Sequence, residues 1–292
     1  MKVDHRAVFS TSADGLKLFA RDYGPEHSDL APVLCLAGLT RNSQDFETIA
    51  PRLVKTRRVI CPDYRGRGLS QFAADPKSYR PDVELDDALR LLDQLGISRV
   101  AVIGTSRGGL IAMVMAAKAR ERLLGICYND IGPRIEPEGL LRIRSYLGVE
   151  PRFDNFEQAV ASIKAVNPGF RNLSDGQWMA FARRIFKDED GRPAANYDLR
   201  LGETFPSAED IAAGKLADAW PLFDLTVPLP STVLRGEFSD LLTTATVAEM
   251  QRRHPALAAV TVRDRAHVPL LDEPESVVAI EAWLRAVDVS LK

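Results

Sequence analysis

Residues 102–110 read Val102-Ile103-Gly104-Thr105-Ser106-Arg107-Gly108-Gly109-Leu110, a Gly-x-Ser-x-Gly pentapeptide between an apolar run and a helical pattern. By chance the bare pentapeptide occurs in roughly one chain in ten of this length, given ordinary Gly and Ser usage. Its setting is more specific, because a sharp turn from strand into helix strains the serine backbone and tolerates only small neighbours. Gly104 and Gly108 provide that room. The stretch predicts a buried strand, a tight turn that exposes a nucleophilic Ser106, and a helix; the alternative is a serine that only caps the helix.

The pattern around this stretch is that of a parallel sheet. Helical periodicity over 85–95, ended by Gly96, and over 109–120 alternates with short, continuous apolar runs that are typical of strands buried on both faces. An opening hairpin is predicted around a turn at 13–15. Alternating strands and helices indicate a mostly parallel sheet covered by helices on both faces. The apolar runs are residues 33–37, 59–61, 100–103 and 124–128.

The alternation stops between residues 134 and 220. This segment has helical periodicity, broken by Pro168-Gly169 and Asp190-Gly191, and no convincing strand. A strand at 231–234, a helix at 243–253, a strand at 259–262 and a final helix through 277–284 then resume the earlier pattern. The sequence therefore predicts a core domain formed by residues 1–133 and 221–292, with a helical cap inserted at 134–220.

Composition excludes several classes of protein. The 292 residues include 38 basic and 40 acidic side chains, a net charge of −2 with no concentrated basic run, which argues against nucleic-acid binding. Residues 1–6 lack the apolar stretch of a secretory signal, and no window approaches the roughly 18 to 20 apolar residues of a membrane span. A cytoplasmic protein is expected. The oligomeric state stays open, a homodimer included.

The cysteine pattern favours buried thiols. The three cysteines lie in separate apolar runs, at positions 35, 61 and 127. An odd number with wide spacing argues against a disulfide framework or a metal site. They are expected to be small, buried apolar side chains.

A serine nucleophile needs a base within hydrogen-bond reach, and only four histidines are available. His5, His27 and His254 lie in a terminal segment, a polar turn and a helix end, where a surface role suffices. His267 directly follows the last predicted strand, at the sheet edge where such proteins gather their reactive groups. We predict that His267 is the base.

The base in turn needs a carboxylate that orients it. The loop after the strand at 231–234 offers Asp240 and, as the alternative, Glu237. Asp240 lies later in that loop, before the helix predicted to start at Thr243. We therefore predict Asp240 as the acid.

Two backbone N–H groups are predicted to bind a developing oxyanion. One is that of Arg107, directly after the serine. The other is that of Leu39, in the loop 37–42 after the strand at 33–37. The alternative for this second group is an ordinary loop in which Ser43 caps the next helix.

Four aromatic residues of the insertion, Tyr146, Phe153, Trp178 and Phe181, are candidates for an apolar substrate pocket. The alternative is that they form the core of the cap itself. A further stretch, 63–70, carries two arginines beside glycines but lacks the Lys-Ser/Thr ending of a phosphate-binding loop. We predict that it is a structural loop at the edge of the site.

Several of these segments together resemble the α/β-hydrolases of the bacterial esterase, lactonase and carbon–carbon hydrolase group. They are residues 37–43, 62–70, 102–110, 129–133 and 265–267, and the resemblance spans nearly the whole chain. It implies the α/β-hydrolase fold, with an eight-stranded sheet, a helical cap over the site, and neither cofactor nor metal. The order Ser, Asp, His along the chain agrees with this family.

Two positions refine the resemblance. A serine at 106, in place of aspartate, disfavours the haloalkane dehalogenase and epoxide hydrolase branches. Where many relatives have His-Gly in the oxyanion loop, this chain has Ala37-Gly38. A backbone donor survives that change, whereas the substrate preference of relatives does not carry over.

The resemblance implies hydrolysis of a small-molecule ester or related acyl bond through an acyl-enzyme. A lactonase or carbon–carbon hydrolase using the same three residues is the first alternative. A ligand-binding protein that keeps the scaffold without turnover is the second, although it would need no intact set of Ser106, Asp240 and His267.

Overall fold

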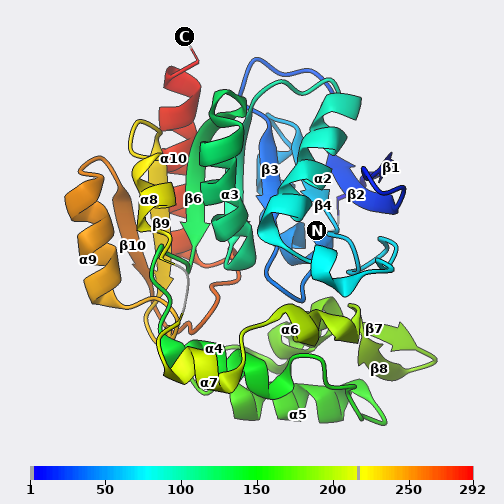
Figure 1. Ribbon diagram of the computed structural model, residues 1–292. Helices are drawn as coiled ribbons and strands as arrows, with labels where there is room; N and C mark the ends of the chain where they lie inside the picture. Colours follow the sequence, from blue (N-terminus) through cyan, green and yellow to red (C-terminus); the bar gives the residue numbers. More distant parts are fainter. Residues whose placement is uncertain (1–2, 216–217, 292) are drawn as a thin grey trace.

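An eight-stranded sheet forms the centre of the protein (Figure 1). The computed structural model describes residues 3–215 and 218–291. The strand order is β1-β2-β4-β3-β5-β6-β9-β10, in which β2 runs antiparallel to β1 and β4 and all other neighbours are parallel. The expected mostly parallel, eight-stranded sheet is confirmed. Its strands are β1 (Arg6–Thr11), β2 (Lys17–Tyr23), β3 (Val33–Leu36), β4 (Val59–Pro62), β5 (Val100–Thr105), β6 (Leu123–Asn129), β9 (Ser231–Gly236) and β10 (Ala258–Val262).

Helices cover both faces of this sheet (Figure 1). Tyr128 of β6 packs against Phe223 of α8 on the face that also carries α2 and α3. A side chain at Gly125, three residues earlier on β6, would instead meet Val287 and Trp283 of α10. The α-helices are α1 (Ala50–Leu53), α2 (Pro81–Gln94), α3 (Arg107–Lys118), α4 (Pro137–Tyr146), α5 (Phe156–Val166), α6 (Asp175–Ile185), α7 (Ala208–Ala212), α8 (Trp220–Asp224), α9 (Thr244–Arg253) and α10 (Pro274–Val289), with short 3₁₀ helices at Ser43–Glu47, Pro76–Ser78, Arg120–Arg122 and Leu199–Thr204.

Local sequence signals account for the central elements. Every residue of β3, β4, β5 and β6 is buried, which explains their continuous apolar runs. Helix α2 starts with Pro81, carries Asp82 and Glu84 in its first turn, and is followed by Gly96 at φ +66°. A proline at the first position, acids near the positive end of the dipole and a left-handed glycine after the end all favour a helix over this range.

The segment between β6 and α8 lies across the carboxyl ends of the parallel strands (Figure 1). It contains α4 to α7 and also a hairpin of β7 (Phe186–Glu189) and β8 (Arg192–Ala195), which corrects the expectation that it holds no strand. Asp190 and Gly191 form the turn, with φ of 52° and 84°. Asp-Gly is a strong hairpin signal, but the exposed β7 lacks the apolar alternation that usually accompanies it.

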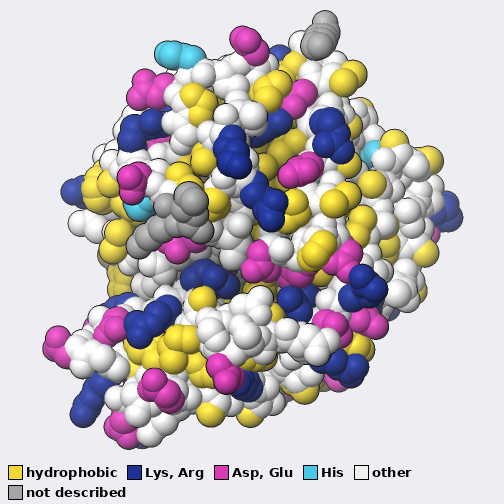
Figure 2. Space-filling view, turned by 180° about the vertical axis from the view of Figure 1, so that it is seen from behind, with side chains coloured by type: hydrophobic (Ala, Val, Ile, Leu, Met, Phe, Trp, Pro, Cys, Tyr) yellow, Lys and Arg dark blue, Asp and Glu magenta, His cyan; other side chains and the backbone are white. Residues whose placement is uncertain are grey.

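The surface carries charges of both signs. Figure 2 shows acidic and basic side chains interspersed over the face it draws, in keeping with the net charge of −2. No helix in the described ranges has the length and apolar character needed to cross a membrane. Cys35, Cys61 and Cys127 are all buried and unpaired, as expected from the sequence.

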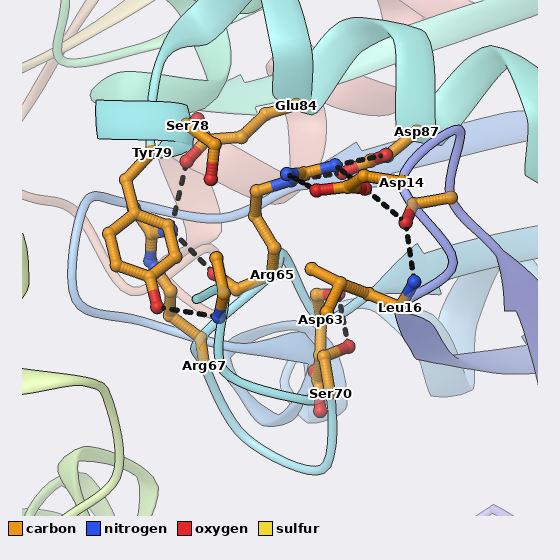
Figure 3. Close-up of polar contacts among 12 residues, drawn as sticks. Asp14, Leu16, Asp63, Arg65, Arg67, Ser70, Ser78, Tyr79, Glu84 and Asp87 are labelled. Atoms are coloured by element: carbon orange, nitrogen blue, oxygen red, sulfur yellow. Dashed lines mark hydrogen bonds and ion pairs between the residues drawn. The ribbon is translucent and has the colours of Figure 1, made fainter. Parts of the chain in front are cut away.

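Ion pairs of two buried arginines hold the loop after β4 against α2 and the first hairpin (Figure 3). Arg65 binds Asp87 of α2 through its Nε, 2.7 Å from Oδ2, and Asp14 of the first hairpin through its Nη1, 2.9 Å from Oδ2. The Glu84 carboxylate is fully buried; its Oε1 lies 2.9 Å from Arg67 Nη1, and its Oε2 lies 2.8 Å from Arg107 Nε. Glu84 therefore connects this loop to the residue that follows Ser106.

Replacing Glu84 with alanine should strongly destabilise the fold, because it leaves two guanidinium groups without their buried partner. We expect the free energy of unfolding to fall by about 3–5 kcal/mol in urea titrations. Asp86→Ala is the matched control on the same helix, since the Asp86 side chain is 57% exposed and lies 4.0 Å from Lys118. The control should lose less than about 1 kcal/mol. Equal losses in the two variants would contradict the role given to Glu84.

Candidate active site

Ser106 occupies a strained turn between β5 and α3. Its φ of 49° and ψ of −110° are unfavourable for a residue with a side chain. The neighbouring glycines make the turn possible: a Cβ on Gly104 would lie 2.6 Å from the Gly109 nitrogen, and one on Gly108 would lie 2.1 Å from the Leu36 oxygen. The strand, the turn and the helix predicted from residues 102–110 are all present.

His267 lies beside Ser106, as the sequence predicted. It belongs to the loop between β10 and α10, and its Nε2 is 2.9 Å from Ser106 Oγ. Its Nδ1 is 2.8 Å from Asp130 Oδ2. Both contacts have hydrogen-bond geometry, and the His267 side chain is only 8% exposed. With one ring nitrogen on the carboxylate and the other on the hydroxyl, His267 is placed to accept the Ser106 proton.

Asp130 is the carboxylate that contacts His267, and sequence reasoning missed it. It directly follows β6, at φ +56°, and its side chain is fully buried. Its Oδ1 accepts the Gly236 N–H at 2.7 Å, and its Oδ2 accepts the Ser239 hydroxyl at 2.6 Å as well as the His267 contact. These donors hold the carboxylate in one orientation. An acid at the carboxyl end of the strand next to β5 was the signal that could have revealed it.

Neither Asp240 nor Glu237, the two acids predicted from the sequence, forms a hydrogen bond with His267. Asp240 binds Arg142 through both oxygens, with Oδ1 2.9 Å from Arg142 Nη2. Burial raises the pKa of Asp240, but the hydrogen bonds and charge of Arg142 outweigh burial and bring the pKa below its usual value. Glu237 accepts the Asp264 N–H at 3.0 Å. The placement of Asp240 as the partner of His267 is therefore wrong, because its charge is already neutralised by an arginine of α4.

The two predicted oxyanion donors are the backbone N–H groups of Arg107 and Leu39. Arg107 is the first residue of α3, so its N–H has no acceptor within the helix. Its side chain is fixed by Glu84 and by the Tyr79 carbonyl, 2.8 Å from Nη2. Leu39 lines the cavity at Ser106, and in the described part of the chain its N–H has no acceptor. Both groups stay available to a negatively charged oxygen.

The oxyanion loop is held in place despite the alanine at position 37. The Tyr64 hydroxyl donates to the Ala37 carbonyl at 3.0 Å, and Arg67 Nε donates to the Leu39 carbonyl at 2.9 Å. Contacts from the loop after β4 therefore fix the loop that carries Leu39.

A cavity of about 770 Å³ opens above Ser106 and His267. Its walls come from the loop after β3 and from α4, α5 and α6. Three of the four predicted pocket residues, Tyr146, Phe153 and Phe181, line it. The size and the mainly apolar walls suit a small organic molecule.

Trp178 does not line this cavity, which corrects its prediction as a pocket residue. Its ring packs against Phe170 and Phe181, with centroid distances of 6.0 and 6.1 Å. It lies one turn of α6 before Phe181 and faces the interior of the inserted segment. Trp178 thus belongs to the core of that segment, the alternative considered for all four residues.

The stretch 63–70 has the structural contacts expected of it. The Asp63 carboxylate accepts the N–H groups of Ser43 at 2.7 Å and Leu69 at 2.9 Å. None of these eight residues is among the described residues that line the cavity at Ser106. The loop therefore supports the site from outside.

If Asp130 orients His267, Asp130→Asn should slow covalent labelling of Ser106 by a fluorophosphonate by about 10³- to 10⁴-fold, because the wrong imidazole tautomer is then favoured. Asp240→Asn is the matched control, and it should slow labelling far less. Mass spectrometry of the Ser106 peptide against time gives the rates. A larger loss in Asp240→Asn than in Asp130→Asn would show that the acid has been misplaced.

Comparisons with known proteins agree with the fold. A family model described as "alpha/beta hydrolase fold" matches residues 31–142. A crystal structure of an α/β-hydrolase from Novosphingobium aromaticivorans superposes with a TM-score of 0.88 and 40% identity, covering 97% of this chain and 99% of the other.

Two named relatives are also similar over most of the sequence. The 3-hydroxybutyrate-oligomer hydrolase of Cupriavidus necator is 35% identical over 251 residues, which cover 84% of this chain and 85% of the relative. The 2-(acetamidomethylene)succinate hydrolase of Mesorhizobium japonicum is 28% identical over 88% of this chain and 87% of the relative. Together with the eight-stranded sheet and the strained serine turn, these matches show that the chain belongs to the α/β-hydrolase family and that hydrolysis is its class of reaction.

Proposed function

We propose that this hydrolase cleaves carboxylic esters, with Ser106 as nucleophile, His267 as general base and acid, and Asp130 as the orienting carboxylate. The continuous hydrogen-bond chain from Asp130 through His267 to Ser106, with contacts of 2.8 and 2.9 Å, carries the proposal. An alcohol is a poor nucleophile unless a positioned base accepts its proton, and this chain provides that base.

The geometry supports acyl transfer in two halves. His267 Nε2 takes the Ser106 proton while Ser106 Oγ attacks the ester carbonyl carbon, and the oxyanion is stabilised by the N–H groups of Leu39 and Arg107. The tetrahedral intermediate collapses as His267 returns the proton to the leaving alcohol, which leaves an acyl group on Ser106. A water molecule then loses a proton to His267 and attacks the acyl carbon, and the proton returns to Ser106 as the acid departs. Asp130 stabilises the imidazolium that forms in each half.

The name of one relative supports an ester as the substrate. The Cupriavidus necator relative is named for oligomers of 3-hydroxybutyrate, and hydroxy-acid units in an oligomer are joined by ester bonds. A lactone or a carbon–carbon bond placed at the same serine remains the alternative substrate. The Ser106 contact with His267 speaks against the second alternative, a ligand-binding protein without turnover, since binding needs no general base.

Ser106→Ala should reduce kcat for a short p-nitrophenyl ester by on the order of 10⁶-fold, because it removes the nucleophile. Ser28→Ala makes the same chemical change on an exposed loop before β3 and should leave kcat within about twofold, as is usual for a surface substitution. Nitrophenolate release gives both rates. Undiminished hydrolysis in Ser106→Ala would contradict the proposal, and so would cleavage of lactones or diketones by a wild-type protein inactive on every ester.

A further inference from the structure

Arg184 is a cation inside the cavity, and no described residue forms a hydrogen bond or an ion pair with it. It lies in the last turn of α6 and lines the same cavity as Ser106 and His267. Among residues 3–215 and 218–291 no acceptor forms a hydrogen bond or an ion pair with its guanidinium group. The guanidinium group lies over the Phe181 ring, whose centroid is 5.9 Å from the Arg184 Cζ.

The other arginines of the cavity differ from Arg184. Arg41 is paired with Asp45, with 2.8 Å between Nε and Oδ2, and Arg142 is paired with Asp240. Arg152 lies at an exposed position, where water solvates its charge. Arg184 alone among these four is partly buried without a bound carboxylate in the described structure.

The charges around Arg184 favour the binding of an additional anion. Burial lowers the pKa of Arg184; Asp45, Asp272 and Glu47 raise it, and Arg41 lowers it further. Asp45 uses both of its oxygens on Arg41, whose Cζ lies 5.1 Å from the centroid of the same Phe181 ring. Two guanidinium groups therefore lie near the Phe181 ring, and a carboxylate is directly bound to only one of them, that of Arg41, in the described structure. A partly buried guanidinium stays charged and is costly to leave unpaired, so a ligand that supplies an anion gains affinity there.

The position of Arg184 relative to the reacting groups indicates what such a ligand is. Arg41, the neighbouring cation, lies two residues after Leu39, whose N–H is a candidate oxyanion donor. Apolar side chains such as Ile163 and Ile185 line the cavity as well. A ligand that fits has an ester carbonyl at Ser106, an apolar chain along these walls and an anionic end at the guanidinium.

We propose that the substrate is an ester bearing a carboxylate, and that Arg184 binds this carboxylate while the ester carbonyl lies at Ser106. The planar guanidinium matches a carboxylate through two parallel hydrogen bonds. This inference rests on the ester hydrolysis proposed above and names the class of ester. The net charge is −2 and charges of both signs are interspersed on the face in Figure 2, so selection of an anion must come from a local cation.

Two pairs of esters test the proposal in the purified full-length protein. In the first pair the carboxylate lies in the acyl half: the p-nitrophenyl monoester of glutaric acid against uncharged p-nitrophenyl pentanoate. In the second it lies in the alcohol half: 3-butanoyloxybutanoate against its uncharged carboxamide. Arg184→Gln should lower the ratio of kcat/KM for the anionic over the neutral ester by about 10- to 100-fold in the pair whose carboxylate reaches Arg184. An unchanged ratio in both pairs overturns the proposal.

Arg183→Gln is the matched control, because it removes the same charge one residue earlier. Arg183 is exposed and pairs with Asp188, at 3.2 Å, away from the cavity at Ser106. In this variant the ratio of kcat/KM for the anionic over the neutral ester should stay within about twofold of the wild-type ratio, as expected for a screened surface charge. An equal fall in both variants would mean that net charge, and not the Arg184 site, selects the substrate, and would overturn the proposal.

A binding measurement separates failure of this inference from failure of the proposed function. Calorimetry with the Ser106→Ala variant should detect binding of glutarate, of 3-hydroxybutyrate or of both. The affinity for that ligand should fall about tenfold or more in the double variant that also carries Arg184→Gln. Arg184-dependent binding in a wild-type protein inactive on every ester would uphold the anion site and reject ester hydrolysis. Ester hydrolysis without Arg184-dependent binding or selectivity would reject the anion site alone.

Discussion

The hydrogen-bond chain from Asp130 through His267 to Ser106 is the interaction on which the rest of the site depends. Its three members come from different elements: Ser106 follows β5, Asp130 follows β6, and His267 follows β10. Parallel strands end at one edge of a sheet, so residues far apart in sequence meet there. The close approach of glycines at the serine turn and the buried ion pairs of Glu84 keep this edge rigid enough to hold contacts below 3 Å.

Much of the fold could be predicted because its signals are local. Continuous apolar runs identified the buried strands, and helix α2 could be read from Pro81 at its start and Gly96 after its end. The hairpin of β7 and β8 was missed for a physical reason. Its Asp190-Gly191 turn is a local signal, but β7 is exposed and packs too little apolar surface to show a period of two.

The site could be predicted only in part, because several of its contacts depend on side-chain direction. Ser106 and His267 follow from motif and strand order. The choice between Asp130 and Asp240 does not follow from strand order, since both residues follow strands of the sheet. The left-handed backbone of Asp130 and the pairing of Asp240 with Arg142 of α4 decide that choice. Likewise, Trp178 and Phe181 lie one turn apart on α6, but only Phe181 lines the cavity. That Arg184 has no bound carboxylate among the described residues could not be predicted either, because it depends on where the neighbouring side chains lie.

The most direct test of this account is the proton NMR spectrum of the His267 ring. A proton on Nδ1 shared with a buried carboxylate gives a resonance far downfield of the amide region. The account predicts that this resonance is present in the wild-type protein, persists in Asp240→Asn and disappears in Asp130→Asn and in His267→Gln. A resonance that persists in Asp130→Asn and disappears in Asp240→Asn would contradict the assignment of the acid and the hydrogen-bond chain built on it.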